Sequence, residues 1–353
     1  MLLKSRDRQD AAAPECDARQ LDLAVGGQAV IEGVMMRSPT ALATAVRTPD
    51  GRVVIRKKPF RSIVRKLPFL NVPVLRGGVH LVETIGLGID ALMFSADQSI
   101  SEDRVDRSKP RLRDTAMMWG TVVLAFALSL GLFFYLPLVL TDLIGVEGTL
   151  WFNVVDGIIR VALFVAYLLA VSKLPDMARV FQYHGAEHKS IHAFENGRPL
   201  TAAGARPFTT LHPRCGTSFL FFVMLISILV FVALGKPDSV GDRLERLLFV
   251  PLIGGLAYEA IKLSGRFATA WWLKPAIGPG LALQRITTSP PDDSQLEVGM
   301  AALRAVLAPE ADGFATRVYY DLPETADEDD AGANEDGALT AGDAAAERPG
   351  GAA

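Results

Sequence analysis

Two long runs without a charged side chain constrain this chain more than any other feature of its sequence. Thr115–Thr141 and Gly216–Gly235 are free of Asp, Glu, Lys and Arg, and each is long enough to cross a bilayer as a helix. In the hydrocarbon core every backbone polar group must be bonded within the protein, which an α-helix achieves. The runs therefore predict a mainly α, polytopic α-helical membrane protein.

Two further segments bring the predicted number of transmembrane helices to about four. Leu150–Ser172 is strongly apolar but contains Asp156 and Arg160. Its thirteen Leu, Ile, Val and Phe residues offset the cost of the two charges, and their spacing lets the charges pair inside the bundle. Leu247–Ile261 is shorter and carries Glu259 near its end. We predict that both segments cross the membrane.

The chain before the first run is expected to hold a small N-terminal β element and an interfacial helix. Ala41–Arg47 and Arg52–Arg56 are predicted strands, joined by a tight turn at Thr48–Gly51. The glycines of Gly26–Arg37 indicate close backbone approach or special turns. Val74–Ala96 has a helical pattern interrupted by four ionisable residues. We therefore expect it to lie at the membrane surface or against the bundle.

After the last predicted span, the chain is expected to become soluble again. Phe267–Lys274 is aromatic and predicts a belt at the membrane interface, and Pro275–Gly280 predicts a helix break. Asp292–Leu307 places its apolar residues on one helical stripe and begins with an aspartate that can cap it. This segment is the predicted cytoplasmic C-terminal helix.

These elements divide the chain into five predicted parts. They are a disordered tail (1–20), a cytoplasmic β element with an interfacial helix (21–114), a four-helix membrane domain (115–263), a cytoplasmic C-terminal segment (264–320) and a disordered acidic tail (321–353). Within the membrane domain, the long connection 173–215 is predicted to be cytoplasmic.

The distribution of charge orients the predicted spans. The formal net charge is −3, but from Leu322 onward nine acids and one arginine give −8, which leaves −3 − (−8) = +5 for the remainder. Lysine and arginine precede the first span and fill 173–215, whereas 142–149 has none. The positive-inside rule then places both termini in the cytoplasm. We expect membrane lipid, and no nucleic acid, as the partner of the basic flanks; the oligomeric state is not predicted.

A cluster of imidazole and thiol side chains in the middle of the chain predicts a metal site. The chain has five histidines, of which three lie in Tyr183–His192, and His212 follows three residues before Cys215. Imidazole, thiolate and carboxylate are the usual ligands of transition metals. With mixed nitrogen and sulfur donors, zinc is the expected ion. The other cysteine is Cys16, so the two cannot form a disulfide framework.

The spacing of the histidines limits which of them can share an ion. If Tyr183–His192 is helical, His184 and His188 lie one turn apart on one face with Glu187 beside them. This His-x-x-Glu-His order is that of the inverted zinc-protease signature, in which the glutamate is the general base. His192 lies about 12 Å beyond His184 along a straight helix. We therefore expect His192 to lie in the second shell or at a second site.

The remaining ligands are left open by the sequence. His212 or Cys215 can complete three protein ligands and leave a position for water, whereas both together would close a structural site. Glu259 is a further candidate ligand, because the downstream helix of inverted zinc proteases supplies a glutamate. Its alternative is a helical ion pair with Lys262.

Three motifs in order resemble the bacterial YqhQ-like family, which has a domain of unknown function and is described as a predicted metal-dependent membrane enzyme. The motifs are Gly27-Gln-Ala-Val-Ile-Glu-Gly-Val-Met-Met-Arg37, Tyr183-His-Gly-Ala-Glu-His-Lys189 and His212-Pro-Arg-Cys-Gly-Thr-Ser-Phe219. The resemblance runs from about Gly26 to Leu307. It implies a multi-pass protein of the bacterial plasma membrane with a bound metal, and it implies no substrate.

Two classes of function follow from these patterns. The first is a metal-dependent hydrolase at the cytoplasmic membrane face, with Glu187 as the general base. The second is a non-enzymatic scaffold, regulator or small transporter with a structural metal site, in which Asp156 and Arg160 form the functional polar pair. A haem site fits less well, because the histidines lie in a polar connection and not inside the predicted spans.

Overall fold

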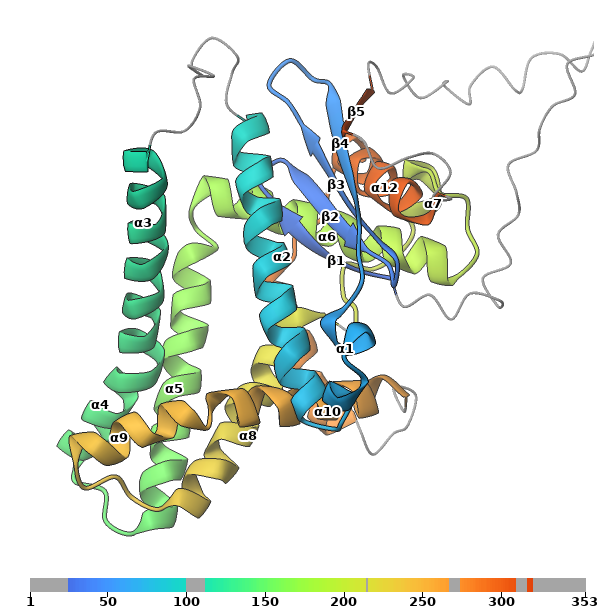
Figure 1. Ribbon diagram of the computed structural model, residues 1–353. Helices are drawn as coiled ribbons and strands as arrows, with labels where there is room; N and C mark the ends of the chain where they lie inside the picture. The colour runs from blue at the N-terminus through green and yellow to red at the C-terminus, as the bar shows by residue number, and fades with distance from the viewer. Residues whose placement is uncertain (1–24, 100–111, 214, 267–273, 309–315, 320–353) are drawn as a thin grey trace, which may run out of the picture.

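The computed structural model describes residues 25–99, 112–213, 215–266, 274–308 and 316–319. The described chain is mostly helical and carries one small β-sheet, as Figure 1 shows. The mainly α architecture with a β element is therefore confirmed. The predicted disordered tails and the aromatic stretch 267–273 lie outside the described residues.

The sheet is an antiparallel meander of four strands with a fifth strand added from the other end of the chain. Its strands, in spatial order, are β1 (Gly26–Val30), β2 (Gly33–Arg37), β3 (Ala41–Arg47), β4 (Val53–Pro59) and β5 (Thr316–Tyr319). The two predicted strands are confirmed as β3 and β4. The sequence underestimated the sheet, because the glycine-rich segment before them also forms strands and β5 joins from the C-terminal segment.

The hairpin between β1 and β2 needs the glycines that mark it. A Cβ on Gly33 would lie 2.2 Å from the Ala45 carbonyl oxygen, so only glycine allows this approach of β2 to β3. Glu32, in the turn before it, has a φ of 51°. Its carboxylate accepts hydrogen bonds from Arg179, at 2.6 Å for Nη2, and from the Tyr183 hydroxyl at 3.3 Å. The turn therefore ties the sheet to a distant helix.

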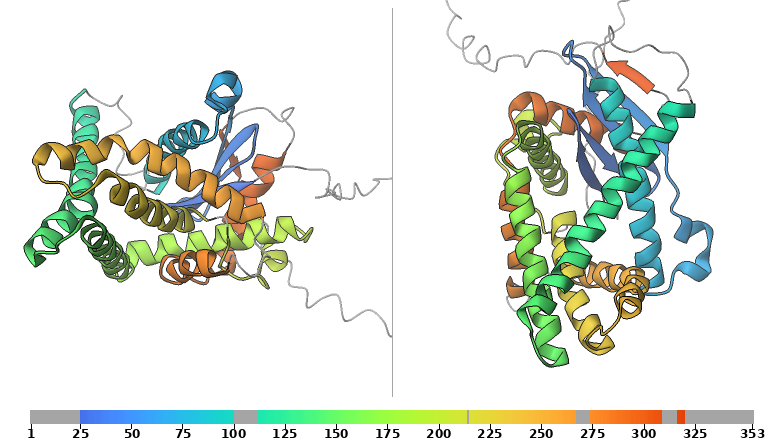
Figure 2. Two further views of the ribbon diagram at one scale, coloured as in Figure 1. Left: turned by 90° about the horizontal axis from the view of Figure 1, so that it is seen from below. Right: turned by 90° about the vertical axis from the view of Figure 1, so that its left-hand side faces the viewer.

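Helices cover both faces of the sheet (Figure 2). One face packs against α6 (Pro175–Glu195) and α12 (Asp293–Leu307), and the other against α2 (Leu75–Ser99). Side chains of β2, β3 and β4 alternate between the two faces, as expected of a sheet covered on both sides. The strand β3 turns its alanines toward α12 and Leu42 toward α2.

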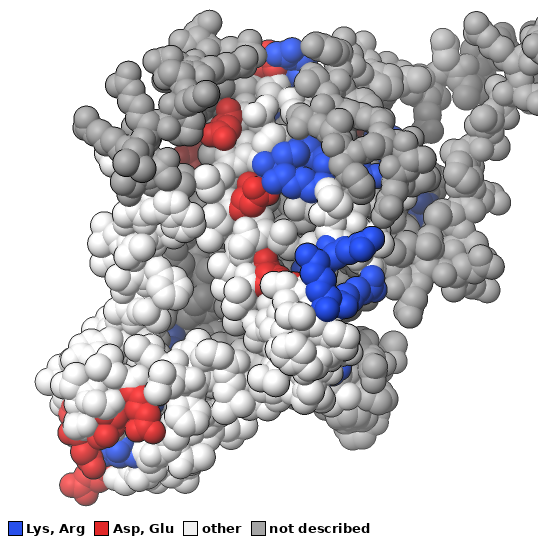
Figure 3. Space-filling view, in the orientation of Figure 1, with Lys and Arg blue, Asp and Glu red and all other residues white. Residues whose placement is uncertain are grey.

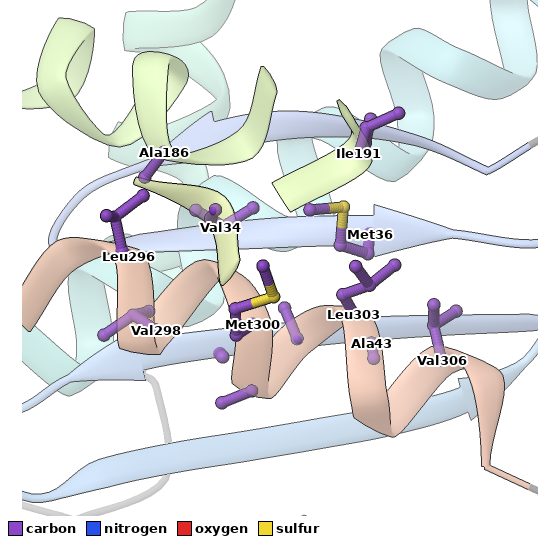
Figure 4. Packing of buried hydrophobic residues seen from close by; sticks show 14 of the residues in the cluster. Val34, Met36, Ala43, Ala186, Ile191, Leu296, Val298, Met300, Leu303 and Val306 are labelled. Atoms are coloured by element: carbon purple, nitrogen blue, oxygen red, sulfur yellow. The ribbon is translucent and has the colours of Figure 1, made fainter. Parts of the chain in front are cut away.

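The larger of the two cores, which we call the α6/α12 core, joins three distant parts of the sequence. Figure 4 shows Met36 of the sheet, Ile191 of α6 and Leu303 of α12 converging in it. The predicted helix Asp292–Leu307 is confirmed as α12, and the Asp292 side chain caps it in a reciprocal capping box with Gln295. Because α12 has apolar neighbours on the sheet and on α6, its burial closes this core.

Four helices among the described residues are long and apolar enough to cross a membrane, which supports the predicted membrane protein. These are α2 (Leu75–Ser99), the continuous stretch Trp119–Ile144, α5 (Thr149–Val171) and α8 (Gly216–Leu234). The second stretch runs through α3 (Leu112–Leu130), η3 (Gly131–Tyr135) and α4 (Leu136–Ile144). Its apolar side chains are widely exposed, as those of Trp119, Phe126 and Leu143 are, which suits a surface that faces lipid.

The set of four differs from the predicted set. The predicted span Leu247–Ile261 corresponds to α10 (Val250–Arg266), which begins after α9 (Val240–Leu248) ends and is not among the four. The helix α2 is apolar enough to cross, although the sequence argued against it. Its ionisable residues are paired: Arg76 with Glu259, His80 with Glu83, and Asp90 with Arg56 and Lys58.

The predicted helix break at Pro275–Gly280 is also wrong. The helix α11 (Lys274–Thr287) runs through it, with Pro279 inside the helix. A Cβ on Gly280 would lie 2.8 Å from the Ser218 hydroxyl oxygen, so the glycine permits close packing of α11 on α8. The residues that the sequence suggested would break a helix instead lie within α11, where Gly280 allows close packing on α8.

The charged pair predicted inside the bundle is confirmed. Arg160 donates to Asp156 at 2.8 Å, and both side chains are buried. Arg246 of α9 is buried nearby and donates to Asn153 at 3.0 Å, and the guanidinium groups of Arg160 and Arg246 lie over the Phe231 ring. Desolvated charges of this kind persist because each has a partner.

In Figure 3 acidic side chains gather at the lower left, basic and acidic side chains also lie along the middle of the molecule, and surface without charged residues separates the two. The acidic patch at the lower left covers α9 and the end of α4. Short helices complete the fold: α1 (Ile63–Lys66), η1 (Pro68–Leu70) and α7 (Ala202–Ala205).

Replacing Leu303 with Ala should lower the free energy of unfolding by about 2–5 kcal/mol, because this side chain is fully buried in the α6/α12 core. Loss of the helical circular-dichroism signal on heating the detergent-purified protein measures the effect. Leu244→Ala is the matched control, since that side chain is 59% exposed. An equal fall in midpoint for both variants would show that α12 does not close a core.

Candidate metal centre

The helix α6 presents the central histidines as predicted. Tyr183–His192 is helical throughout, and the ring centroids of His184 and His188 lie 4.5 Å apart. The prediction that these two histidines share one face, one turn apart, is therefore confirmed.

Both histidines use one ring nitrogen to bond a backbone carbonyl. Nδ1 of His184 lies 2.8 Å from the Thr287 oxygen, and Nδ1 of His188 bonds the Thr210 oxygen. A carbonyl can only accept, so each Nδ1 carries the proton and each Nε2 carries the lone pair. This support is typical of metal-ligating histidines. Burial also lowers the pKa of His188, which favours the neutral form that binds metals.

Cys215 joins the two histidines at the start of α8. It is the N-cap residue of that helix, and its buried sulfur lies 3.2 Å from Nε2 of His184 and accepts the Thr217 backbone N–H. One ligand atom from each of His184, His188 and Cys215 falls within 4.8 Å of the other two. We call these three residues the first ligand group.

The spacing of the donor atoms fits a tetrahedral ion. Zinc–nitrogen and zinc–oxygen bonds of about 2.0–2.1 Å place two such ligands about 3.3 Å apart, and a sulfur ligand about 3.6 Å from a nitrogen. Oε2 of Glu187 lies 3.4 Å from Nε2 of His188, and the Cys215–His184 separation is slightly shorter than expected, at 3.2 Å. The two imidazoles and the thiol of the first ligand group make a donor set that suits zinc.

Glu187 is buried beside the first ligand group, where the sheet meets α6. Its side chain is 4% exposed, and it accepts a backbone hydrogen bond from Gly27 of β1. A Cβ on Gly27 would lie 2.7 Å from the Glu187 side chain, so this glycine makes room for the carboxylate. Burial raises the pKa of Glu187, and the neighbouring histidines oppose the rise.

A second set of possible ligands lies at the C-terminal end of α6. His192, Glu195 and His212 each offer a ligand atom within 4.8 Å of the other two. The His212 ring lies between the rings of His188, 5.7 Å away, and His192, 4.8 Å away. We call His192, Glu195 and His212 the second ligand group.

The predicted ligands are thus divided by the structure. His184, His188 and Cys215 come together, while His212 lies in the second ligand group with His192. Glu259 belongs to neither group among the described residues; Arg76 donates to it at 2.6 Å, so the pairing is with an arginine and not with Lys262.

The sequence missed several residues that build the site. Glu195 follows His192 by three residues on α6, a helical spacing that could have revealed it. Gly27 lies in a motif whose glycines did indicate close approach. Thr287 acts through its backbone carbonyl and leaves no chemical signature in a sequence. The side chain of Gln284 is fully buried. It accepts a hydrogen bond from the His212 backbone N–H at 2.8 Å and donates one to the His212 carbonyl oxygen, also at 2.8 Å.

Comparisons with known proteins identify the family. The family described as "Protein of unknown function (DUF1385)" matches residues 72–309. This chain is a member of the DUF1385 family. It is also 31% identical over 304 residues to "Uncharacterized protein YqhQ" of Bacillus subtilis (strain 168), a match that covers 82% of this chain and 93% of that protein. No solved structure matches.

The match confirms the resemblance to YqhQ-like proteins. The region common to the DUF1385 family contains both ligand groups, whereas β1 to β4 precede it. Neither description names an activity or a metal, so the case for a metal rests on the residues themselves.

Gly185→Ala should weaken transition-metal binding, although Gly185 has no side chain that could bind the metal. Its Cβ would lie 2.1 Å from the Ser289 carbonyl oxygen, so the segment after α11 must move away from α6. Thr287 would move with it and withdraw the acceptor of His184, a loss of support that costs about 10–100-fold in metal affinity. Titration of the purified variant with zinc measures this. Gly120→Ala is the control, because nothing lies within 4 Å of its added Cβ; unchanged affinity in Gly185→Ala would contradict the assignment.

Proposed function

We propose that this protein is a multi-pass membrane metalloprotein of the bacterial plasma membrane, and that its metal centre is hydrolytic. The observation that carries the proposal is the convergence of His184, His188 and Cys215 with Glu187 beside them. The three ligands leave a position for water, and the carboxylate supplies a base. The expected ion is zinc.

Each side chain has a distinct part in such a site. His184, His188 and Cys215 would hold the ion, which as a Lewis acid lowers the pKa of a bound water to near neutrality. Glu187 would take up the proton from that water on its carboxylate. The β1 backbone at Gly27 holds this carboxylate in place through the hydrogen bond described above. Glu259 has no part in this site, because Arg76 already engages it.

The competing function is a structural metal in a scaffold, regulator or small transporter. Its support is that the first ligand group already brings three protein ligands together. With a fourth protein ligand the site would be closed, and the buried pair Asp156 and Arg160 would carry the function. X-ray absorption spectroscopy separates the two: a water in the coordination sphere favours the hydrolase, and four protein ligands favour the structural site.

Packing restricts how the chain threads the membrane. The sheet, α6 and α12 share one core, so these parts must lie on the same side of the bilayer. Between two of them the chain must then cross an even number of times. Three apolar helices separate β4 from α6, and α2 packs Ala91 and Phe94 onto the sheet. We infer that α2 stays on the side of the sheet, and that the stretch through α3 and α4 and the helix α5 make the two crossings.

The second half of the chain must also return to the side of the bilayer on which α6 lies. The helix α8 leads away from α6, and α12 must return to it, so 250–287, with α10 and α11, would be the returning segment. Both of these helices pack against α8. This gives four crossings, with both termini and both ligand groups in the cytoplasm by the positive-inside rule. The acidic patch on α9 would then face outward.

The segment between β4 and α2 is suited to the lipid surface. Phe69 is 68% exposed, and Ile63 and Leu67 are also exposed. Arg65 and Lys66 end the short helix α1 beside them. Apolar side chains with a basic rim are typical of segments that lie in the headgroup region. Lipid is therefore the proposed partner of this face.

Glu187→Gln should keep the metal and abolish function. The substitution preserves shape but removes the proton acceptor, which typically costs about 10²–10⁴-fold in rate. Metal content of the purified protein and rescue of a deletion phenotype are measured on the same variant. His188→Ala is the comparison, and it should lose both metal and function because it removes a ligand. Full metal and full rescue in Glu187→Gln would overturn the hydrolytic mechanism; loss of metal in both variants would favour the structural site.

Cysteine labelling of intact cells tests the threading. In a Cys16→Ser background, Glu147→Cys between α4 and α5 should react with a membrane-impermeant maleimide, and Asn196→Cys after α6 should not. Both positions are exposed, so the two variants differ only in the side on which they lie. Permeabilised cells should label both. Labelling of Asn196→Cys from outside would contradict the proposed orientation.

A further inference from the structure

The second ligand group has the features of a built site. His212 presents its Nε2 at 3.4 Å from Oε2 of Glu195, close to the separation of about 3.3 Å expected for two ligands of one ion. His192 completes the group within 4.8 Å. The two histidines are part-buried and buried, whereas Glu195 is exposed, so the group opens toward solvent on the side of the glutamate.

The two histidines of this group have supporting contacts of their own, separate from those of the first ligand group. Nε2 of His192 lies 2.9 Å from the Leu211 carbonyl oxygen, and its ring stacks on Phe208 at 5.9 Å and 18°. The backbone of His212 is clamped on both sides by Gln284. Ligands fixed in this way lose little conformational entropy when an ion binds.

The donors of the second ligand group differ from those of the first. It offers two imidazoles and a carboxylate and has no sulfur, a set that suits borderline divalent ions such as Zn²⁺, Mn²⁺ and Fe²⁺. The His212 ring stands next to the His188 ring, so the groups are neighbours. Paired divalent ions are a recurrent device for stabilising the attacking and leaving oxygens in hydrolysis.

We propose that His192, Glu195 and His212 form a second divalent-cation site beside the first, which makes the centre binuclear. The site extends the metal centre proposed above, but its ligands are its own. Its glutamate faces solvent, so the second ion exchanges more readily than the first.

Cobalt titration of the metal-free, detergent-purified protein distinguishes the two sites. Cobalt bound to Cys215 gives a thiolate charge-transfer absorption, whereas cobalt in the second ligand group gives none. The wild type should bind two equivalents. Glu195→Gln should bind one with the absorption intact, its second equivalent weakened by more than the about 10–100-fold that loss of a second-shell partner costs. His184→Ala should lose the absorption and keep the other equivalent.

The control variant lies on the same helix but outside both ligand groups. Asp176→Asn, an exposed acid in the first turn of the same helix, should bind both equivalents, and circular dichroism checks the fold of every variant. Two equivalents in Glu195→Gln with wild-type affinity, or a single equivalent in the wild type that Glu195→Gln leaves unchanged, would overturn the second site. A missing thiolate absorption with one equivalent that depends on Glu195 would instead overturn the first site and retain the second.

Discussion

Two hydrogen bonds from imidazole to backbone carbonyl organise the centre of this protein. They join His184 to the last residue of α11 and His188 to the segment before α8, so three stretches of chain meet at one helix face. Each bond fixes a tautomer and aims Nε2 inward. Without them, neither imidazole would have a hydrogen bond that fixes its ring orientation toward Cys215.

Much of the fold follows from local patterns in the sequence. Uncharged runs predict spans, the tight turn at Thr48–Gly51 predicts the hairpin of β3 and β4, and the cap at Asp292 predicts the start of α12. The predictions failed where long-range packing decides the outcome. The charges of α2 looked unfavourable because their partners are distant in sequence, such as Glu259 for Arg76. Pro279 and Gly280 looked like a break because the contact with Ser218 cannot be read locally.

The candidate site, like the fold, was predictable where local spacing decides and not where long-range packing decides. The spacing of four between His184 and His188 predicts a shared face, and the distance along the helix separates His192 from them. The choice between His212 and Cys215 as third ligand could not be made from sequence, because it depends on how the connection before α8 folds back. The structure gives Cys215 to the first ligand group by placing it at the N-cap of α8. Backbone acceptors such as Thr287 have no side-chain signature and stay invisible in a sequence.

The α6/α12 core is assembled from segments that the ribosome makes far apart in time. The strands β1 to β4 and α6 are complete while Thr287, α12 and β5 are still to be synthesised, beyond α8, α9 and α10. In the proposed threading, the acceptor of His184 and the helix that closes the core therefore arrive only at the end of the last crossing. A chain arrested or threaded wrongly before that step has its histidines but not their support. Stable occupancy of such a centre would then record that membrane insertion has been completed.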